Sequence, residues 1–455
     1  MKPTASSLAP TIALLPFGFL IEDFLDKINV SLEAFCTEMT GGWLFGYMEA
    51  LRSAGVRTVL ICVSARVPKP TRFIHTPSGM PVWVLPSPPI YMSMRRRMRN
   101  PYARDVEHTY GVLTGVGRIA APWRWLQKEL APYLSVPSKQ LAETLRLEHC
   151  LAMVCQEYEY PGFDVCVWLG RRLGLPVFGV FQGGDYQRGR AERFIRRFSI
   201  RACSGLIIAT KRETERVRSR YATAESKQAR IFNPIDVHEM WRPVDRAEAR
   251  AHLGIPQAAR VAVWHGRVAL HQKGLDILLA VWDQICRDRR GRELRLLLIG
   301  TGQDAQELAR RIATLRLSSV QWIDEYVLDR SRMRGLLCAA DVYVFLSRHE
   351  GFPVAPTEAM ACGLPVVAAA ANGIPDILDG GDSAGGVIVP QEDVAAAASA
   401  LGRLLDNETL SRQLGHRARA RAEDAFSLAA VGAQLRRFLV RPEPSGLTTG
   451  GVDRS

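Results

Sequence analysis

Short runs of apolar residues, many of them β-branched, recur along the chain between longer stretches of mixed polarity. A continuous apolar run of this kind is typical of a strand buried on both faces of a parallel sheet. The first half contains such runs at Thr11–Pro16, Val56–Ser64, Phe163–Trp168, Leu175–Phe181 and Leu206–Ala209. The second half contains them at Val261–His265, Leu294–Ile299, Val320–Tyr326, Val342–Ser347 and Leu364–Ala369. The pattern predicts strands that alternate with helices, as in doubly wound α/β domains.

Helices are predicted between and after these strands. Residues Leu32–Ala54 read as a glycine loop at Gly41-Gly42 followed by a helix, and Leu401–Ala425 reads as helical. A second helix is expected from Phe426 to Leu439. Residues 441–455 are polar and rich in Gly, Thr and Pro, a composition that predicts disorder.

The length and the charge distribution indicate two domains. At 455 residues the chain is long for a single domain. A turn cluster, Ile231–Asp236, lies at mid-chain. Up to Pro234 the chain has 32 Lys and Arg against 19 Asp and Glu, and beyond it 27 of each, so the whole excess of +13 lies in the first half. We therefore predict a first domain over 1–235 and a second over 236–425.

Cysteine usage and hydropathy indicate a cytoplasmic protein. Nine cysteines are scattered without C-x-x-C pairs, which favours reduced core thiols over disulfides or a zinc site. No apolar run reaches the 18 or so residues that a membrane-spanning helix needs. The apolar run Thr11–Ile21 is interpreted as the first strand rather than as a signal peptide, because Glu22-Asp23 follows at once.

The segment Asp341–Ala371 combines two predicted strands with a very short helix. Pro356 suits the first helical turn, and Gly363 with Pro365 ends the helix. Glu358 lies in that first turn, where the helix dipole favours a carboxylate. Glu350 lies in a loop at the carboxyl end of a strand, where open α/β sheets bind ligands. The intervening loop, Gly351-Phe352-Pro353, enters a helix N-terminus and could receive an anion such as phosphate.

Two cations are predicted near the same edge of the second sheet. Arg267 follows the strand Val261–His265, and Lys273 precedes the next helix. Cations held at such positions can neutralise a diphosphate as it leaves. The turn Gly300-Thr301-Gly302 ends another strand but lacks the third glycine of a dinucleotide fingerprint.

These motifs, in this order, resemble one family. The segment EGFPVAPTE (350–358) followed by AMACGLPVV, together with GR at 266–267 and KG at 273–274, resembles the retaining glycosyltransferases of family 4. The resemblance implies the GT-B fold, in which two Rossmann-like doubly wound parallel-sheet domains face a cleft. It implies that Glu350 contacts the donor sugar, that Glu358 holds the ribose of a nucleoside-diphosphate sugar, and that Arg267 and Lys273 clamp the diphosphate. The cluster at 233–236 is similar to the family's interdomain linker, and residues 426–440 to the helix that crosses back to the first domain.

The resemblance implies further contacts with donor and acceptor. Backbone near Tyr326 and Val327 would hold the base, and Gly302 lies in the matching glycine turn. In the first domain Gly41 and Gly42 would let an acceptor or diphosphate approach the backbone, although a plain turn explains them equally well. Gln182 stands where many relatives have a histidine, and a glutamine can hydrogen-bond a sugar hydroxyl but cannot shuttle a proton. Asp185 either contacts the acceptor or caps a turn.

The stretch Tyr91–Trp125 mixes arginines with methionines, tyrosines and tryptophans. Such a mixture can bind anionic lipid headgroups, and it can equally be a solvated basic loop beside the acceptor cleft. No nucleic-acid-binding motif is present, so nucleic acid is not expected as a partner. The arginines at 188, 190, 193, 196 and 197 predict a basic, solvated helix face.

Taken together, the sequence predicts an enzyme that moves a sugar, with retention, from a nucleoside-diphosphate sugar to a glycan, lipid-linked or small-molecule acceptor. Fixed cations and a helix N-terminus could do the work of a metal, so neither a metal nor a cofactor is expected. Two alternatives are a sugar-nucleotide epimerase or hydrolase on the same fold, and a non-catalytic protein that binds anionic lipid. The expected location is the cytoplasm, with peripheral contact to a membrane.

Overall fold

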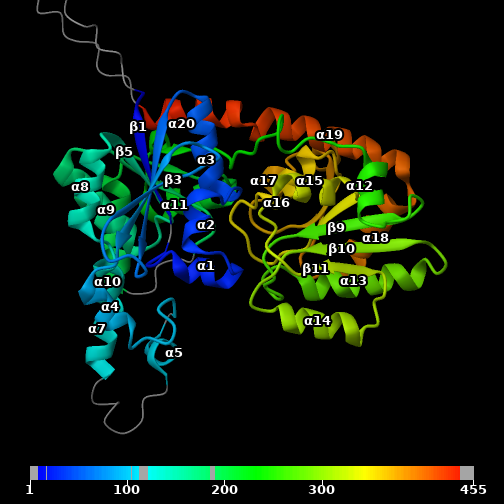
Figure 1. Cartoon of the computed structure of the whole chain (residues 1–455), viewed down its shortest axis with the longest axis horizontal. Coiled ribbons are helices and arrows are strands. Elements are labelled where there is room, and N and C mark those ends of the chain that lie inside the picture. Colours follow the sequence, from blue (N-terminus) through cyan, green and yellow to red (C-terminus); the bar gives the residue numbers. More distant parts are fainter. Residues whose placement is uncertain (1–8, 17, 104, 112–120, 185–189, 441–455) are drawn as a thin grey trace, which may run out of the picture.

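The computed structural model describes residues 9–440 except 17, 104, 112–120 and 185–189. It contains two α/β domains side by side, each built on one sheet (Figure 1). Asp185, Arg188 and the predicted disordered tail at 441–455 lie outside the described residues.

The first domain is built on an eight-stranded sheet with the order β3-β4-β2-β1-β5-β6-β7-β8. All neighbours in it are parallel except β3 and β4. The strands are β1 Thr11–Leu15, β2 Arg57–Ser64, β3 Thr71–Ile74, β4 Pro81–Pro86, β5 Cys150–Gln156, β6 Val177–Val180, β7 Gly205–Ile207 and β8 Gln228–Ala229. The helices are α1 Glu22–Ile28, α2 Leu32–Thr37, α3 Gly42–Ser53, α4 Pro89–Arg95, α5 Val106–Tyr110, α7 Ala121–Leu134, α8 Ser138–Leu147, α9 Pro161–Leu173, α10 Arg190–Ala202 and α11 Lys211–Tyr221.

The second domain has a six-stranded parallel sheet with the order β11-β10-β9-β12-β13-β14. The strands are β9 Arg260–His265, β10 Leu294–Ile299, β11 Val320–Ile323, β12 Val342–Phe345, β13 Val366–Ala369 and β14 Gly386–Val389. The helices are α12 Arg246–His252, α13 Leu275–Asp288, α14 Ala305–Thr314, α15 Arg330–Cys338, α16 Ala355–Ala361, α17 Ile374–Ile377, α18 Val394–Asp406 and α19 Glu408–Phe426, and the chain then continues into α20, Leu428–Leu439. The strand order reverses between β9 and β12, and such a switch point opens a crevice at the carboxyl ends of the strands.

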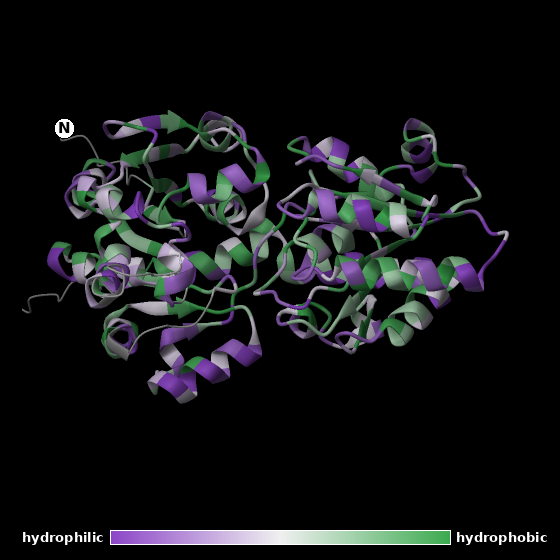
Figure 2. Ribbon diagram, turned by 90° about the horizontal axis from the view of Figure 1, so that it is seen from below, coloured by the Kyte–Doolittle hydropathy of each residue, from purple (hydrophilic) through white to green (hydrophobic). Residues whose placement is uncertain are grey.

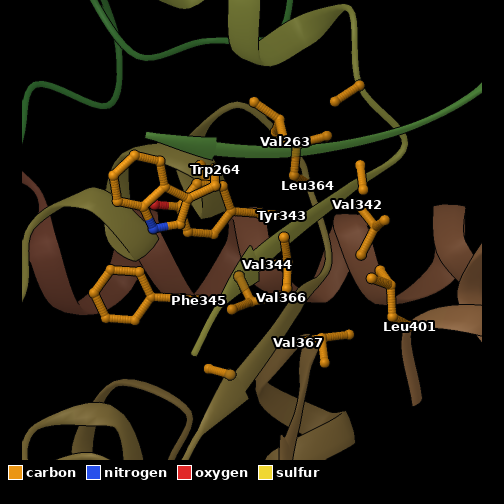
Figure 3. Close-up of a cluster of buried hydrophobic side chains, with 14 of the residues drawn as sticks. Val263, Trp264, Val342, Tyr343, Val344, Phe345, Leu364, Val366, Val367 and Leu401 are labelled. Atoms are coloured by element: carbon orange, nitrogen blue, oxygen red, sulfur yellow. The ribbon is translucent and has the colours of Figure 1, made fainter. Parts of the chain in front are cut away.

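The central strands of the second sheet are buried because both of their faces are covered. Val342–Phe345 of β12 and Val366–Ala369 of β13 are buried throughout. Figure 3 shows Trp264, Tyr343 and Phe345 packed together beside the aliphatic side chains of these strands. In Figure 2 the helices are banded purple and green, as expected for helices with one apolar and one polar face.

The chain returns to the first domain at its end. Helix α19 runs along the second domain, and α20 continues along the first, where it packs on α3 (Figure 1). Gly432 of α20 lies so close to α3 that an added Cβ would be 2.2 Å from the carbonyl oxygen of Ala50.

One predicted strand was wrong. Residues Phe163–Trp168 form the middle of α9, and the strand of this region is β5, which the apolar pattern did not single out. Pro161 starts the helix and Gly174, with φ of +68°, ends it. Trp168 is exposed while Phe163 and Val167 are buried, a spacing that belongs to a helix.

Three other predictions differ from the structure in part. The range Leu401–Ala425 is helical as predicted except at Asn407, which separates α18 from α19; its side chain accepts a hydrogen bond from the N–H of Leu410 and caps the second helix. Arg196 does not belong to a solvated basic face, because its side chain is fully buried and pairs with Asp164 at 2.7 Å. The stretch Tyr91–Trp125 is partly core, since Tyr91 and Met98 are buried.

Candidate functional site

A cavity of about 310 Å³ lies between the two domains, at the switch point of the second sheet. The first domain contributes Gly42, Trp43, Gln156 and Gln182 to its wall, and Asn233 comes from the linker between the domains. The second domain contributes His265, Gly266, Lys273, Phe345, Glu350 and the residues from Phe352 to Ala355. The volume is within the range of small-molecule sites.

Lys273 and Glu350 form an ion pair in this cavity. The ammonium of Lys273 lies 2.6 Å from a carboxylate oxygen of Glu350, and both side chains are largely buried. Lys273 is placed by the turn that enters α13, where Gly274 has φ of +61° and lies against the carbonyl of Leu346. The pair places one positive and one negative charge side by side on the cavity wall.

Glu358 and His265 form a second buried pair. Nε2 of His265 lies 2.9 Å from Oε2 of Glu358. His265 ends β9 and lines the cavity, while Glu358 is held in the first turn of α16. Sequence reasoning missed His265, because its partner lies 93 residues away and no local motif marks it.

Arg267 lies two residues after His265 in the sequence. It comes one residue after Gly266 of the cavity wall, is half-buried, and donates to the side-chain oxygen of Gln272 at 3.1 Å. Arg267 itself is not among the lining residues.

The loop at 351–353 contacts the first domain directly. A Cβ at Gly351 would lie 2.3 Å from the backbone of Gln182, so only glycine allows this approach. The Phe352 ring stacks on Phe232 with centroids 5.1 Å apart, and its carbonyl accepts a hydrogen bond from Asn233 at 3.0 Å. Pro353 lines the cavity, as do Val354 and Ala355 at the start of α16. The first N–H groups of a helix have no partners within it, so this end suits an anion.

The predicted base-binding residues lie outside the cavity wall. Burial raises the pKa of Tyr326 to about 12, and the nearby Glu358 adds to the rise. Val327 packs on the core of the second domain. Gly302 lies against Val268, and a Cβ there would be 2.2 Å from the Val268 carbonyl oxygen, so this glycine lets the loops after β9 and β10 touch.

The predicted acceptor residues differ in their surroundings. Gly41 and Gly42 have φ of +86° and +64°, and an added Cβ at either would meet nothing within 4 Å. Gln182 exchanges two hydrogen bonds with the side-chain amide of Asn233, at 2.9 and 2.8 Å. Its amide is therefore engaged with the interdomain linker, whereas the glycine pair borders open space.

A buried glutamate behind Gln182 was also missed. Glu157 follows β5 with φ of +59°, and its carboxylate accepts the backbone N–H of Gln182 at 2.7 Å. Burial raises the pKa of Glu157 to about 8, while hydrogen bonds from Gly184 and Gln182 oppose the rise. Glu157 thus holds the loop that touches Gly351.

Neither a metal cluster nor a membrane span is found among the described residues. No group of three or more His, Cys, Asp or Glu side chains there could hold a metal ion. Within 9–440, less the short gaps, no helix is both long enough and apolar enough to cross a bilayer.

Comparison with known sequences connects the second domain to one family. The model of the family glycosyl transferases group 1 matches residues 259–407. D-inositol 3-phosphate glycosyltransferase 1 of Catenulispora acidiphila is 32% identical over 241 residues, which cover 52% of this chain and 57% of that protein. D-inositol 3-phosphate glycosyltransferase of Saccharomonospora viridis is 28% identical over 274 residues, 56% of this chain and 63% of that protein. The chain spans less than two thirds of either relative.

Solved structures with the same arrangement of both domains cover nearly the whole chain. Sucrose-phosphate synthase from Thermosynechococcus elongatus has a TM-score of 0.65 at 20% identity and covers 94% of this chain and 97% of its own. Anabaena HepE in complex with UDP has a TM-score of 0.64 at 16% identity, with coverages of 94% and 99%. OtsA has a TM-score of 0.67 at 12% identity, with coverages of 96% and 100%.

Proposed function

Residues 259–407 form a glycosyl transferases group 1 domain in a chain of the GT-B fold, and on this premise we propose that the protein transfers a sugar from a nucleoside-diphosphate sugar to an acceptor hydroxyl, with retention at the anomeric carbon. The observation that carries the proposal is the interdomain cavity. It combines the Lys273–Glu350 pair, the start of α16 and the wall residue His265, which holds Glu358. The first domain contributes Gly42 of its glycine pair to the wall of the same cavity.

In the proposed reaction the donor's diphosphate lies beside Lys273 and Arg267 and in front of the first N–H groups of α16. The bond between the anomeric carbon and a diphosphate oxygen breaks, the acceptor oxygen bonds to the same face of that carbon, and the acceptor's proton passes to the departing diphosphate oxygen. Negative charge develops on the departing diphosphate. Fixed positive groups aimed at developing charge are commonly the largest contribution to catalysis, and removing one typically costs about 10²–10³ in rate.

The two glutamates take different parts. Glu358, oriented by His265, accepts hydrogen bonds from the ribose hydroxyls. Glu350 contacts the transferred sugar and holds Lys273 in place through their ion pair. We propose that Tyr326, Val327 and Gly302, which lie outside the cavity wall, support the part of the site that holds the base of the nucleotide. The charges of Lys273 and Arg267 make a metal unnecessary in this scheme, so activity should persist in a chelator.

Uridine nucleotides are the first donors to test, because HepE has been solved with UDP and with UDP-glucose. Inositol phosphates are the first acceptors to test, in view of the named relatives. We propose the cytoplasm as the location, since all nine cysteines are free and eight of them are buried.

The test is turnover with a panel of sugar nucleotides, with and without acceptors, and with the anomeric configuration of the product read by NMR. We expect acceptor-dependent transfer with retention, and we expect Lys273→Ala to lower the transfer rate by about 10²-fold or more. The exposed lysine variant Lys139→Ala is the matched control and should be unaffected.

Two outcomes would favour the alternatives. Turnover without an acceptor would indicate an epimerase or hydrolase. Vesicle binding without affinity for any sugar nucleotide would indicate a non-catalytic lipid-binding protein.

A further inference from the structure

Helix α10 exposes its phenylalanines and buries two of its charged side chains, Glu192 and Arg196. Phe194 and Phe198 are 65% and 55% exposed, and their rings touch with centroids 4.8 Å apart. Glu192 and Arg196, on the other side of the helix, are buried. A surface helix normally shows the reverse arrangement.

The buried charges fix this orientation. Arg196 is fully buried and lies 2.7 Å from Asp164 of α9 and 3.3 Å from Glu192. Breaking a buried ion pair is costly, so α10 cannot turn its phenylalanines inward without leaving these charges unpaired. The apolar side therefore faces outward.

Helix α7 carries a second exposed apolar stripe. Trp123 is 61% exposed, and Leu126 and Leu130 follow it at helical spacing, with Trp125 at the edge. Both helices pack on α9, and Tyr133 of α7 donates to the same Asp164 that pairs with α10. Figure 1 shows α7, α4 and α10 together at one end of the first domain. We name these exposed side chains the α7–α10 face: Trp123, Trp125, Leu126, Leu130, Phe194, Ile195 and Phe198.

The charges on this face are basic. On α10 the residues Phe194, Arg197, Phe198 and Arg201 share one side at helical spacing, and all are exposed. From 193 to 201 every exposed residue of α10 is an arginine, a phenylalanine or an isoleucine. The first half of the chain also carries the entire net positive charge.

We propose that the α7–α10 face binds the surface of an anionic lipid bilayer. Tryptophan and phenylalanine insert at the boundary between headgroups and acyl chains, and neighbouring arginines pair with anionic headgroups. The charge complementarity favours lipid over a protein partner, because the outward side of α10 offers cations without exposed acids. The inference does not depend on the proposed transfer reaction. The proposed contact keeps Trp123 and Trp125 of the Tyr91–Trp125 stretch, leaves out its buried residues Tyr91 and Met98, and adds α10.

The test is co-sedimentation of the full chain with phosphatidylcholine vesicles, with and without phosphatidylglycerol. We expect binding that requires phosphatidylglycerol and weakens several-fold as salt is raised, because headgroup pairing is screened. The double variants Phe194→Ser/Phe198→Ser and Trp123→Ser/Trp125→Ser should each lose binding at least tenfold. Arg197→Glu/Arg201→Glu should remove the preference for phosphatidylglycerol.

The matched control is Leu147→Ser/Leu151→Ser, which removes two equally exposed leucines at the end of α8 and the start of β5. This control should bind vesicles like the unchanged protein, and thermal unfolding verifies that every variant is folded. Absence of binding to phosphatidylglycerol vesicles, or an equal loss in the leucine control, overturns the proposal. A concentration-dependent dimer that disappears in Phe194→Ser/Phe198→Ser would identify the face as a contact between copies and overturn it as well.

Discussion

Single residues at the cavity differ in how far the sequence reveals them. Glu350 and Glu358 could be singled out because a strand end, a proline and a glycine fix their local setting. His265 and Glu157 could not, since each acts through a partner that the fold brings from far along the chain. The role of a buried polar residue depends on the groups that surround it in the fold. The local sequence pattern does not show those groups.

Glu157 makes a pH dependence predictable. Its folded-state pKa of about 8 lies above the ordinary value of 4.5, so the folded state holds the proton more tightly than the unfolded state. The stabilisation from this group is complete below the unfolded pKa and is lost as pH rises through about 8. When the pH is raised from 5.5 to 8.5, we expect the loss of this contribution from Glu157 to lower the free energy of unfolding by about 1–3 kcal/mol.

Urea unfolding of Glu157→Gln at these two pH values tests this. The variant should show a smaller loss of stability with pH than the unchanged protein. Glu307→Gln is the control, because exposed Glu307 pairs with Arg310 and Arg311, which hold its pKa at about 2 and keep it ionised over this range. An identical pH dependence in Glu157→Gln would mean that Glu157 does not bind the proton.

At the scale of elements, the apolar runs predicted most strands because both faces of each sheet are covered. They failed at Phe163–Trp168, where a short apolar run fits a strand or a buried helix equally well and only Pro161 and Gly174 indicate the helix. They also failed to divide α18 from α19, because Asn407 is the only interruption in a long helix-forming stretch.

The contact between α20 and α3 gives a prediction for one glycine. Gly432→Ala would place a Cβ 2.2 Å from the carbonyl oxygen of Ala50, so the two helices must separate. Overpacking of this kind costs about 1–3 kcal/mol in the free energy of unfolding.

The same substitution at Gly335, inside α15, is the matched control. A Cβ there meets nothing within 4 Å, and alanine should stabilise by about 0.4–1 kcal/mol. Chemical denaturation measures both variants. Equal effects of the two substitutions would contradict the tight packing of α20 on the first domain.

At the scale of the whole molecule, the two-domain organisation followed from length, charge and the order of the strands. The contacts between the two domains could not be predicted in this way, because they join residues that are far apart in the sequence. Arg230 pairs with Asp376 at 2.9 Å, and Arg330 pairs with Glu49 at 3.4 Å, across the two domains. The backbones of the two domains also come close together at Gly183 and Gly351, beside the cavity.

Gly351→Val tests whether this approach sets the distance between the domains. The added side chain would overlap the backbone of Gln182, so the domains should open. We expect a larger radius of gyration in small-angle X-ray scattering, and a loss of transfer activity of about tenfold or more from misplaced reacting groups. Gly335→Val, in open space, should leave the radius of gyration unchanged. An unchanged radius in Gly351→Val would show that the interface is set elsewhere.

The central claim is that the cavity between the domains receives a sugar nucleotide through Lys273 and Glu358. Calorimetric titration of UDP and UDP-glucose, followed by other nucleoside-diphosphate sugars, tests it on the unchanged protein, Lys273→Ala, Glu358→Ala and Lys139→Ala. The account predicts that a nucleotide bound by the unchanged protein binds at least tenfold more weakly, by about 1.4 kcal/mol, to Lys273→Ala and Glu358→Ala, and equally well to Lys139→Ala. Undiminished affinity in both cavity variants would contradict it.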